Sequence, residues 1–150
     1  MKKAHIAYGV LVMLVIVGAA FFALSRTQPA TSSALRTVQL DGQTIRVSIA
    51  DTEASRELGL GGRTGLAPDE GMLFIFPQDG VYAFWMKDMK FSIDMIWISS
   101  SGTVTYMAQN VSPDTFPKDF GPGTPARYVL ELPAGWANAH GVRVGDSVAL

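Results

Sequence analysis

The chain has 150 residues, of which 48% are hydrophobic, with twelve Lys and Arg, thirteen Asp and Glu, and no cysteine. This length allows one domain with a proper hydrophobic core. The lack of cysteine excludes disulfides, thiolate metal sites and a cysteine nucleophile. After Leu24, ten basic residues stand against thirteen acidic ones, and they form no basic cluster, which argues against binding to DNA or RNA.

The N-terminus predicts a transmembrane helix. Lys2 and Lys3 precede residues 6–24, an unbroken stretch of 19 residues without a charge, long enough to cross a bilayer of about 30 Å as a helix. An uncleaved anchor is favoured over a cleaved secretory signal, because the apolar stretch is long and the small residues 18–20 mark a cleavage site poorly. The two lysines should stay in the cytoplasm, so that the rest of the chain lies outside it, or is secreted if the segment is cleaved.

The chain divides into three expected parts. Residues 1–24 are the membrane anchor or signal segment, residues 25–34 are a small, polar and flexible linker, and residues 35–150 are a β domain. In this domain Asp41-Gly42 separates two alternating apolar runs, which predicts a first hairpin. Asp51 or Thr52 should then cap a short helix that ends at the glycine-rich residues 59–62.

The central stretch predicts three neighbouring antiparallel strands, over residues 72–76, 81–86 and 91–98, with residues 77–80 as a turn between the first two. Alternation in the second run places Trp85 and Lys87 on one side. These two could form a ligand platform of a ring and a cation, or Trp85 could fill the core while Lys87 neutralises a carboxylate. Both interpretations stay open from the sequence.

Two carboxylates and three arginines are further candidates. Asp94 is the only charge in residues 91–98, and the strand predicted over residues 126–132 places Arg127 and Glu131 on one side. Arg56 and Arg63 lie on either side of the glycine-rich turn, as solvated charges, as partners of a buried carboxylate, or as a fork for a ligand carboxylate.

The remaining elements follow from the same patterns. Residues 103–108 predict a strand, and the proline-rich residues 110–125 predict a long irregular loop. Such a loop serves either as the rim of a binding site or as a cover over a sheet edge. Residues 136–140 predict a single helical turn, and residues 148–150 predict a closing strand.

Several of these segments carry a family resemblance when they are read together. The segments are Arg56 with Gly59-Leu60 and Arg63, the run 71–76 (GMLFIF), the run 84–87 (FWMK), Asp94, the run 126–132 (ARYVLEL), Gly135, and Gly141 through Gly145-Asp146. In this order and spacing the chain resembles the domain-of-unknown-function family numbered 192. It departs from the usual pattern at Asp88-Met89, where Asn-Thr is usual, and at Ser55 and Gly61.

The resemblance implies a mainly β fold: a compact antiparallel sandwich or flattened barrel, jelly-roll-like, with short helices. It also implies an exported or membrane-anchored N-terminus. The family carries no established activity, so the chemistry of the chain stays open.

The favoured function is a membrane-tethered, extracytoplasmic binding or accessory domain for a small anionic or carbohydrate-like ligand such as a glycan. The expected ligand-binding residues are Arg56, Arg63, Trp85, Lys87, Asp94, Arg127 and Glu131. One alternative is a hydrolase that uses Asp94 and Glu131 as paired carboxylates. Another is a structural or protein-interaction module in which these charges pair with one another. His5 and His140 are the only histidines, so neither a metal site, a cofactor nor a Ser-His-Asp triad is expected.

Overall fold

A computed structural model describes residues 35–150 of the chain. The predicted membrane anchor and linker, residues 1–34, lie outside the described residues. Within the described part, none of the helices has the length and hydropathy that crossing a bilayer requires.

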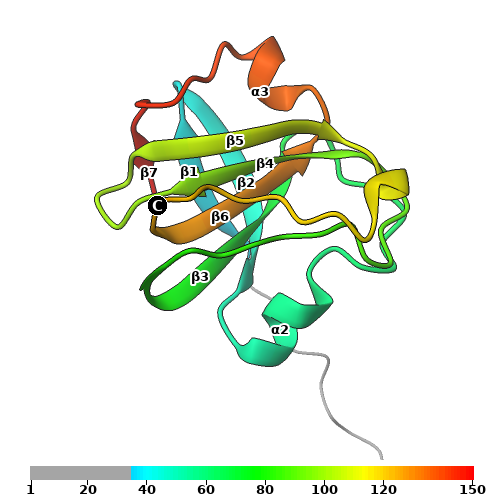
Figure 1. Ribbon diagram of the computed structural model, residues 1–150. Helices are drawn as coiled ribbons and strands as arrows, with labels where there is room; N and C mark the ends of the chain where they lie inside the picture. Colours follow the sequence, from blue (N-terminus) through cyan, green and yellow to red (C-terminus); the bar gives the residue numbers. More distant parts are fainter. Residues whose placement is uncertain (1–34) are drawn as a thin grey trace, which may run out of the picture. The chain divides into compact units, whose positions relative to one another are not determined.

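Within residues 35–150, seven strands form a single curled sheet, and the helices that accompany it there are short (Figure 1). The strands are β1 (Arg36–Leu40), β2 (Gln43–Ala50), β3 (Glu70–Gly80), β4 (Ile93–Ile98), β5 (Val104–Val111), β6 (Ala126–Pro133) and β7 (Val148–Ala149). The helices are α2 (Glu53–Leu58), α3 (Trp136–Ala139) and the 3-10 turn η1 (Pro113–Thr115). The order across the sheet is β5-β4-β6-β3-β2-β1-β7. The prediction of a mainly β domain with short helices is therefore confirmed.

The sheet curls into a half-barrel whose two edge strands approach each other. An isolated antiparallel bridge joins Thr103, just before β5, to Ser147, just before β7. The amide of Val148 also donates a 2.7 Å hydrogen bond to the carbonyl of Gly102. Of the two expected shapes, a sandwich or a flattened barrel, the barrel is therefore the closer, because a single sheet curls around its own core.

The structure confirms the predicted first hairpin and the predicted start of the short helix. Asp41 and Gly42 both have positive φ, 49° and 72°, as the tight turn between β1 and β2 requires. The hydroxyl of Thr52 accepts a hydrogen bond from the amide of Ser55, and the hydroxyl of Ser55 accepts one from the amide of Thr52, so that a capping box begins α2.

The sheet is not wholly antiparallel, which corrects one expectation. Strand β3 runs parallel to β2, with Arg46 opposite Glu70 and Ala50 opposite Phe74. Parallel neighbours need a crossover connection, and here α2 and the turns up to residue 69 supply it. This crossover carries α2 over one face of the sheet, where it becomes one wall of a pocket.

The predicted hairpin between residues 72–76 and 81–86 is also wrong. Strand β3 continues through Pro77 to Gly80, and residues 81–92 follow as an irregular segment with one isolated bridge, Phe84 to Phe120. Strand β6 takes the place beside β3, and β4 pairs with β6 and β5. The ring of Tyr82 stacks on Phe76 at 3.5 Å, and its carbonyl accepts from the indole of Trp97, so tertiary contacts replace the strand ladder.

Each face of the sheet has its own hydrophobic cluster. The inner cluster includes Leu40, Ile96, Leu130 and Trp136, the first residue of α3. The outer cluster includes Phe74, Met95, Trp97 and Val129, and the segment 81–92 and Phe120 pack against it. Figure 1 shows α3 and α2 at opposite ends of the view, consistent with their association with different faces. The candidate site lies on the outer face.

Candidate functional site

A pocket of about 520 Å³ opens between α2, strands β3 and β6, and the segment 81–92. We call it the α2 pocket. Its lining residues are Glu53, Arg56, Glu57, Leu58, Gly59, Leu60, Gly61, Phe74, Phe76, Ala83, Phe84, Trp85, Lys87, Met89 and Glu131. This volume suits a small organic ligand, since most such sites measure several hundred Å³ and are lined mainly by apolar groups with a few polar ones.

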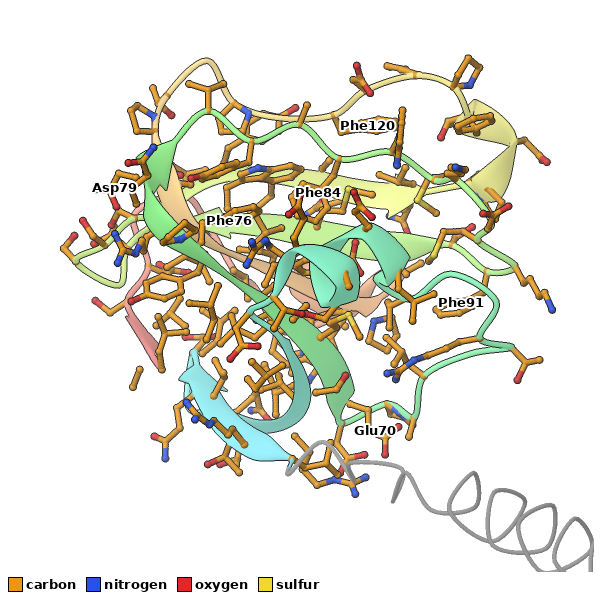
Figure 2. The ribbon with its side chains drawn as sticks, turned by 90° about the horizontal axis from the view of Figure 1, so that it is seen from below. Glu70, Phe76, Asp79, Phe84, Phe91 and Phe120 are labelled. Carbon is orange, nitrogen blue, oxygen red and sulfur yellow. The ribbon has the colours of Figure 1, made fainter. Side chains whose placement is uncertain are left out.

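Three phenylalanines form one wall of the α2 pocket. The rings of Phe74 and Phe84 meet edge to face with centroids 4.8 Å apart, and Phe76 and Phe84 do so at 6.3 Å. Figure 2 shows Phe76 and Phe84 close to each other beside α2, with Phe120 nearby. Alternation along β3 directs Phe74 and Phe76 to the same face, and the irregular path of residues 81–92 brings Phe84 to them. The wall offers a rigid apolar surface.

Glu131 contributes a buried carboxyl group to the α2 pocket. Only 4% of the residue is exposed, and its Oε2 atom has no hydrogen-bond partner among residues 35–150. In the sheet it lies between Met72 of β3 and Met95 of β4. A buried polar atom without a partner costs free energy, so it calls for an explanation such as a ligand that supplies the partner.

The surroundings of Glu131 make its carboxyl group hard to ionise. Burial raises its pKa from 4.5 to about 8, and the positive charge of Arg63 only partly opposes this shift. At neutral pH the group is therefore mainly protonated. In that form it donates one hydrogen bond, which an ionised carboxylate cannot do.

Arg56 links α2 to strand β3 at the edge of the pocket. Its Nη1 atom donates hydrogen bonds to the carbonyls of Asp51, at 2.6 Å, and Ile75, at 3.0 Å. Its guanidinium carbon also lies 5.4 Å from the centre of the Phe76 ring. Two carbonyls and a ring occupy much of this side chain, so it shapes the pocket wall more than it offers a free cation.

Trp85 and Lys87 lie together, as the alternation predicted, although they do not belong to a strand. The ammonium of Lys87 is 6.0 Å from the centre of the Trp85 ring, and 53% of Trp85 is exposed. The Trp85 ring also meets Phe116 edge to face at 6.0 Å. None of the ion pairs among residues 35–150 involves Lys87. An exposed indole and an unpaired ammonium thus stand side by side at the pocket.

Asp94 lies in a different environment, on the inner side of the sheet. It is fully buried, and its carboxylate accepts backbone hydrogen bonds from Asn110, at 2.8 Å, Gly135, at 3.1 Å, and Ala137, at 2.9 Å. These bonds fix the turn before α3 and the end of β5. Asp94 therefore has a structural role here, and the expected pairing of Asp94 with Glu131 in one hydrolytic site is contradicted, because the two carboxyl groups face opposite sides of the sheet.

The remaining two candidates lie outside the lining of the α2 pocket. Arg63 donates a 3.3 Å hydrogen bond to the hydroxyl of Ser48 and acts on Glu131 through its charge. Arg127 pairs with Asp79 at 3.8 Å. The structure thus brings together Arg56, Trp85, Lys87 and Glu131, keeps Arg63 within electrostatic range, and separates Asp94 and Arg127 from them.

Sequence reasoning missed most of the pocket's apolar lining. Alternation along one strand places Phe74 and Phe76 on the same face. The position of Phe84 beside them depends on the fold of residues 81–92. From the sequence, the glycines after α2 are expected only to stop the helix and to make a tight turn. Gly61 has a further role, since a Cβ there would lie 2.8 Å from the carbonyl of Leu58, so only glycine keeps this wall of the pocket in its present path.

Comparison with known proteins supports the resemblance. The model of the family of uncharacterized proteins DUF192 matches residues 36–150. A proposed transcription regulator from Sinorhizobium meliloti 1021 shares 35% identity and a TM-score of 0.74, over 79% of this chain and 95% of that one. A protein of unknown function from Novosphingobium aromaticivorans DSM 12444 shares 27% identity and a TM-score of 0.76, over 83% and 91%. No curated protein matches the chain.

Proposed function

The chain belongs to the DUF192 family, and we propose that its β domain binds a small anionic or carbohydrate-like ligand in the α2 pocket. The observation that carries this proposal is the buried Oε2 atom of Glu131, which has no hydrogen-bond partner within the described part of the chain, in a residue that lines the pocket. A ligand with a polar group at this depth would satisfy it. The aromatic wall and the exposed Trp85 ring would take the ring or apolar part of the same ligand.

The different surroundings of Asp94 and Glu131 help to decide between a binding domain, a structural module and a hydrolase. In a purely structural module the buried charges are expected to pair with protein groups, as Asp94 does with three amides. Glu131 departs from this pattern, which favours a binding site. A hydrolase of this kind would need both carboxyl groups beside one substrate bond. The structure disfavours this arrangement, because the two groups face opposite sides of the sheet.

DNA binding is not part of the proposal, although one relative is described as a proposed transcription regulator. Residues 35–150 carry nine Lys and Arg against thirteen Asp and Glu. Two of the three ion pairs of this region neutralise Arg46, and the third neutralises Arg127. A nucleic-acid interface needs a surplus of free cations on one face, and this composition disfavours it.

A thermal-shift screen would test the binding function. The full-length chain, purified in a mild detergent, is heated with a panel of organic acids and mono- and oligosaccharides. We expect at least one class to raise the melting temperature, because a ligand that binds only the native state stabilises it. Trp85→Ala and Lys87→Ala should abolish this response, whereas Lys90→Ala, an exposed lysine three positions further on, should retain it. No response across the panel would contradict the proposal.

We also propose that the domain is tethered to the membrane by residues 6–24 and held outside the cytoplasm. The support is the uncharged apolar stretch behind Lys2 and Lys3. Alkaline phosphatase fused after Leu150 should be active in a bacterial host, because this enzyme forms its disulfides only outside the cytoplasm. Green fluorescent protein at the same place should then stay dark. The reverse pattern would place the domain in the cytoplasm.

A further inference from the structure

The charges around Glu131 leave the deep part of the α2 pocket without a negative group at neutral pH. The strands on either side present Met72 and Met95, which carry no charge. The other elements that pack around the pocket contribute, in chain order, Glu53, Arg56 and Glu57 from α2, Arg63 from the turn after it, and Lys87 from the segment 81–92. The two glutamates of α2 are exposed to solvent. The buried carboxyl group therefore has the charge of Arg63 within range, and none of the other described residues that line the pocket is a buried anion.

The cations differ in whether protein groups already occupy them, and this difference affects which class of ligand the pocket can bind. Arg56 is occupied by two carbonyls and the Phe76 ring. Lys87 and Arg63, by contrast, appear in none of the ion pairs among the described residues. These two cations, one in the lining of the pocket and one near it, favour an anionic ligand over a cationic one.

We propose that the ligand of the α2 pocket is a small organic carboxylate with a flat apolar group, which deepens and rests on the binding function proposed above. The carboxyl group of Glu131 donates a hydrogen bond to one oxygen of the ligand carboxylate, and Lys87 supplies the opposite charge. The flat group lies against the wall of Phe74, Phe76 and Phe84, with Trp85 at the mouth.

A carboxylate with a flat apolar group would give both the polar groups and the apolar wall of the site a partner in one molecule. The Oε2 atom of Glu131 gains the hydrogen-bond partner that the described residues do not provide. A hydrogen bond with an ionised member is roughly twice as strong as a neutral one. A neutral sugar would also give Glu131 a partner, but it would leave the ammonium of Lys87 without a counter-charge. A carboxylate on an apolar ring therefore fits the combination of groups better.

Benzoate, benzamide and methyl glucoside are suitable probes for calorimetric titration of the full-length chain. Benzoate and benzamide have the same ring and shape, and only benzoate is charged. We expect benzoate to bind at least about tenfold more tightly than either neutral probe, since one unpaired charge contributes about that much. Its affinity should fall about tenfold between about pH 6.5 and about pH 9, because Glu131, with a pKa of about 8, then loses the proton that it donates.

Matched variants separate this mechanism from a general charge effect. Glu131→Gln keeps a donor that does not titrate, so benzoate binding should persist and the pH dependence should disappear. Lys87→Gln should weaken benzoate binding about tenfold and leave benzamide binding unchanged, whereas Lys90→Gln should change neither. Equal binding of benzoate and benzamide, or a pH dependence that survives in Glu131→Gln, would overturn the proposal.

The failure of this inference can be told apart from the failure of the binding function. If benzoate does not bind but a neutral or sugar compound binds and depends on Trp85, the carboxylate class is wrong and the α2 pocket is still a binding site. If neither the three probes nor any compound of the wider panel binds, both proposals are wrong.

Discussion

Asp94 and Glu131 lie on paired strands of the sheet, but their side chains point to opposite faces. In the pairing of β4 with β6, Asp94 is opposite Leu132, and its neighbour Met95 is opposite Glu131. Three backbone amides donate hydrogen bonds to the carboxylate of Asp94, whereas Oε2 of Glu131 finds no hydrogen-bond partner in the part of the chain that the structure describes. Two carboxyl groups of nearly equal burial should therefore respond in different ways to substitution.

Replacement of Asp94 by alanine should strongly destabilise the domain. The change leaves the amides of Asn110, Gly135 and Ala137, the last of them in a buried residue, without their acceptor, so the free energy of unfolding should fall by about 3 kcal/mol. Urea denaturation followed by circular dichroism measures this loss. Asp119→Ala, at an exposed aspartate, should stay within about 0.5 kcal/mol of the wild type. If Asp94→Ala were as stable as that control, the structural role of Asp94 would be wrong.

The pH dependence of stability should identify Glu131. Its pKa is about 8 in the folded chain and 4.5 when exposed, so between these values the folded state binds one proton more than the unfolded state. Stability contributed by the neutral form is then present below about pH 4.5 and is lost as the pH rises to about 8, by roughly 5 kcal/mol at most.

Glu131→Gln removes this titration and provides the control. Urea denaturation at several pH values should show the wild type weakening from about pH 5 to about pH 8, with a flatter profile for the variant. At about pH 8 the variant should be the more stable of the two. Identical profiles for both proteins would show that the carboxyl group of Glu131 does not resist ionisation.

The sequence was informative where the partners of a segment are close in the chain. The same dipeptide occurs twice, as Asp41-Gly42 and as Asp79-Gly80. The first makes a hairpin, because β1 and β2 are each other's neighbours. The second lies inside β3, because β6, some fifty residues further on, pairs with this strand and Gly80 is opposite Ala126. Local turn chemistry cannot reveal a competing partner at that distance.

The same limit applies to the candidate site. Alternation along the run 126–132 correctly separated Val129 from Tyr128 and Leu130, and so placed Glu131 on the outer face. Whether Asp94 shares that face depends on the register between β4 and β6, which a single sequence does not encode locally. The place of Phe84 depends likewise on the irregular path of residues 81–92. The chemistry of single residues was therefore predictable, and their grouping was not.

Gly61→Ala should disturb the turn that forms one wall of the α2 pocket. An added Cβ would lie 2.8 Å from the carbonyl oxygen of Leu58, so the backbone must shift, and the free energy of unfolding should fall by about 1–3 kcal/mol. Gly65→Ala is the matched control, because its Cβ would meet no atom within 4 Å. Urea denaturation compares the two. Equal stability of both variants would show that the turn adjusts without cost.

The two tryptophans of the outer face should differ sharply on truncation. Trp97 is fully buried, donates its indole proton to the carbonyl of Tyr82 at 2.9 Å, and packs against Phe84 and Tyr106. Trp97→Ala should therefore cost about 3–5 kcal/mol of the free energy of unfolding. Trp85, which is 53% exposed, should cost less than about 1 kcal/mol when it is replaced by alanine.

Trp85→Ala should keep the fold and remove only the ring at the mouth of the α2 pocket. Denaturation curves of both variants give the two free energies directly. A loss at Trp85 as large as that at Trp97 would mean that the exposed indole holds the loop of Phe116 in place and serves stability. A small loss leaves the exposed ring without a structural reason, as expected of a side chain whose role is to contact a ligand.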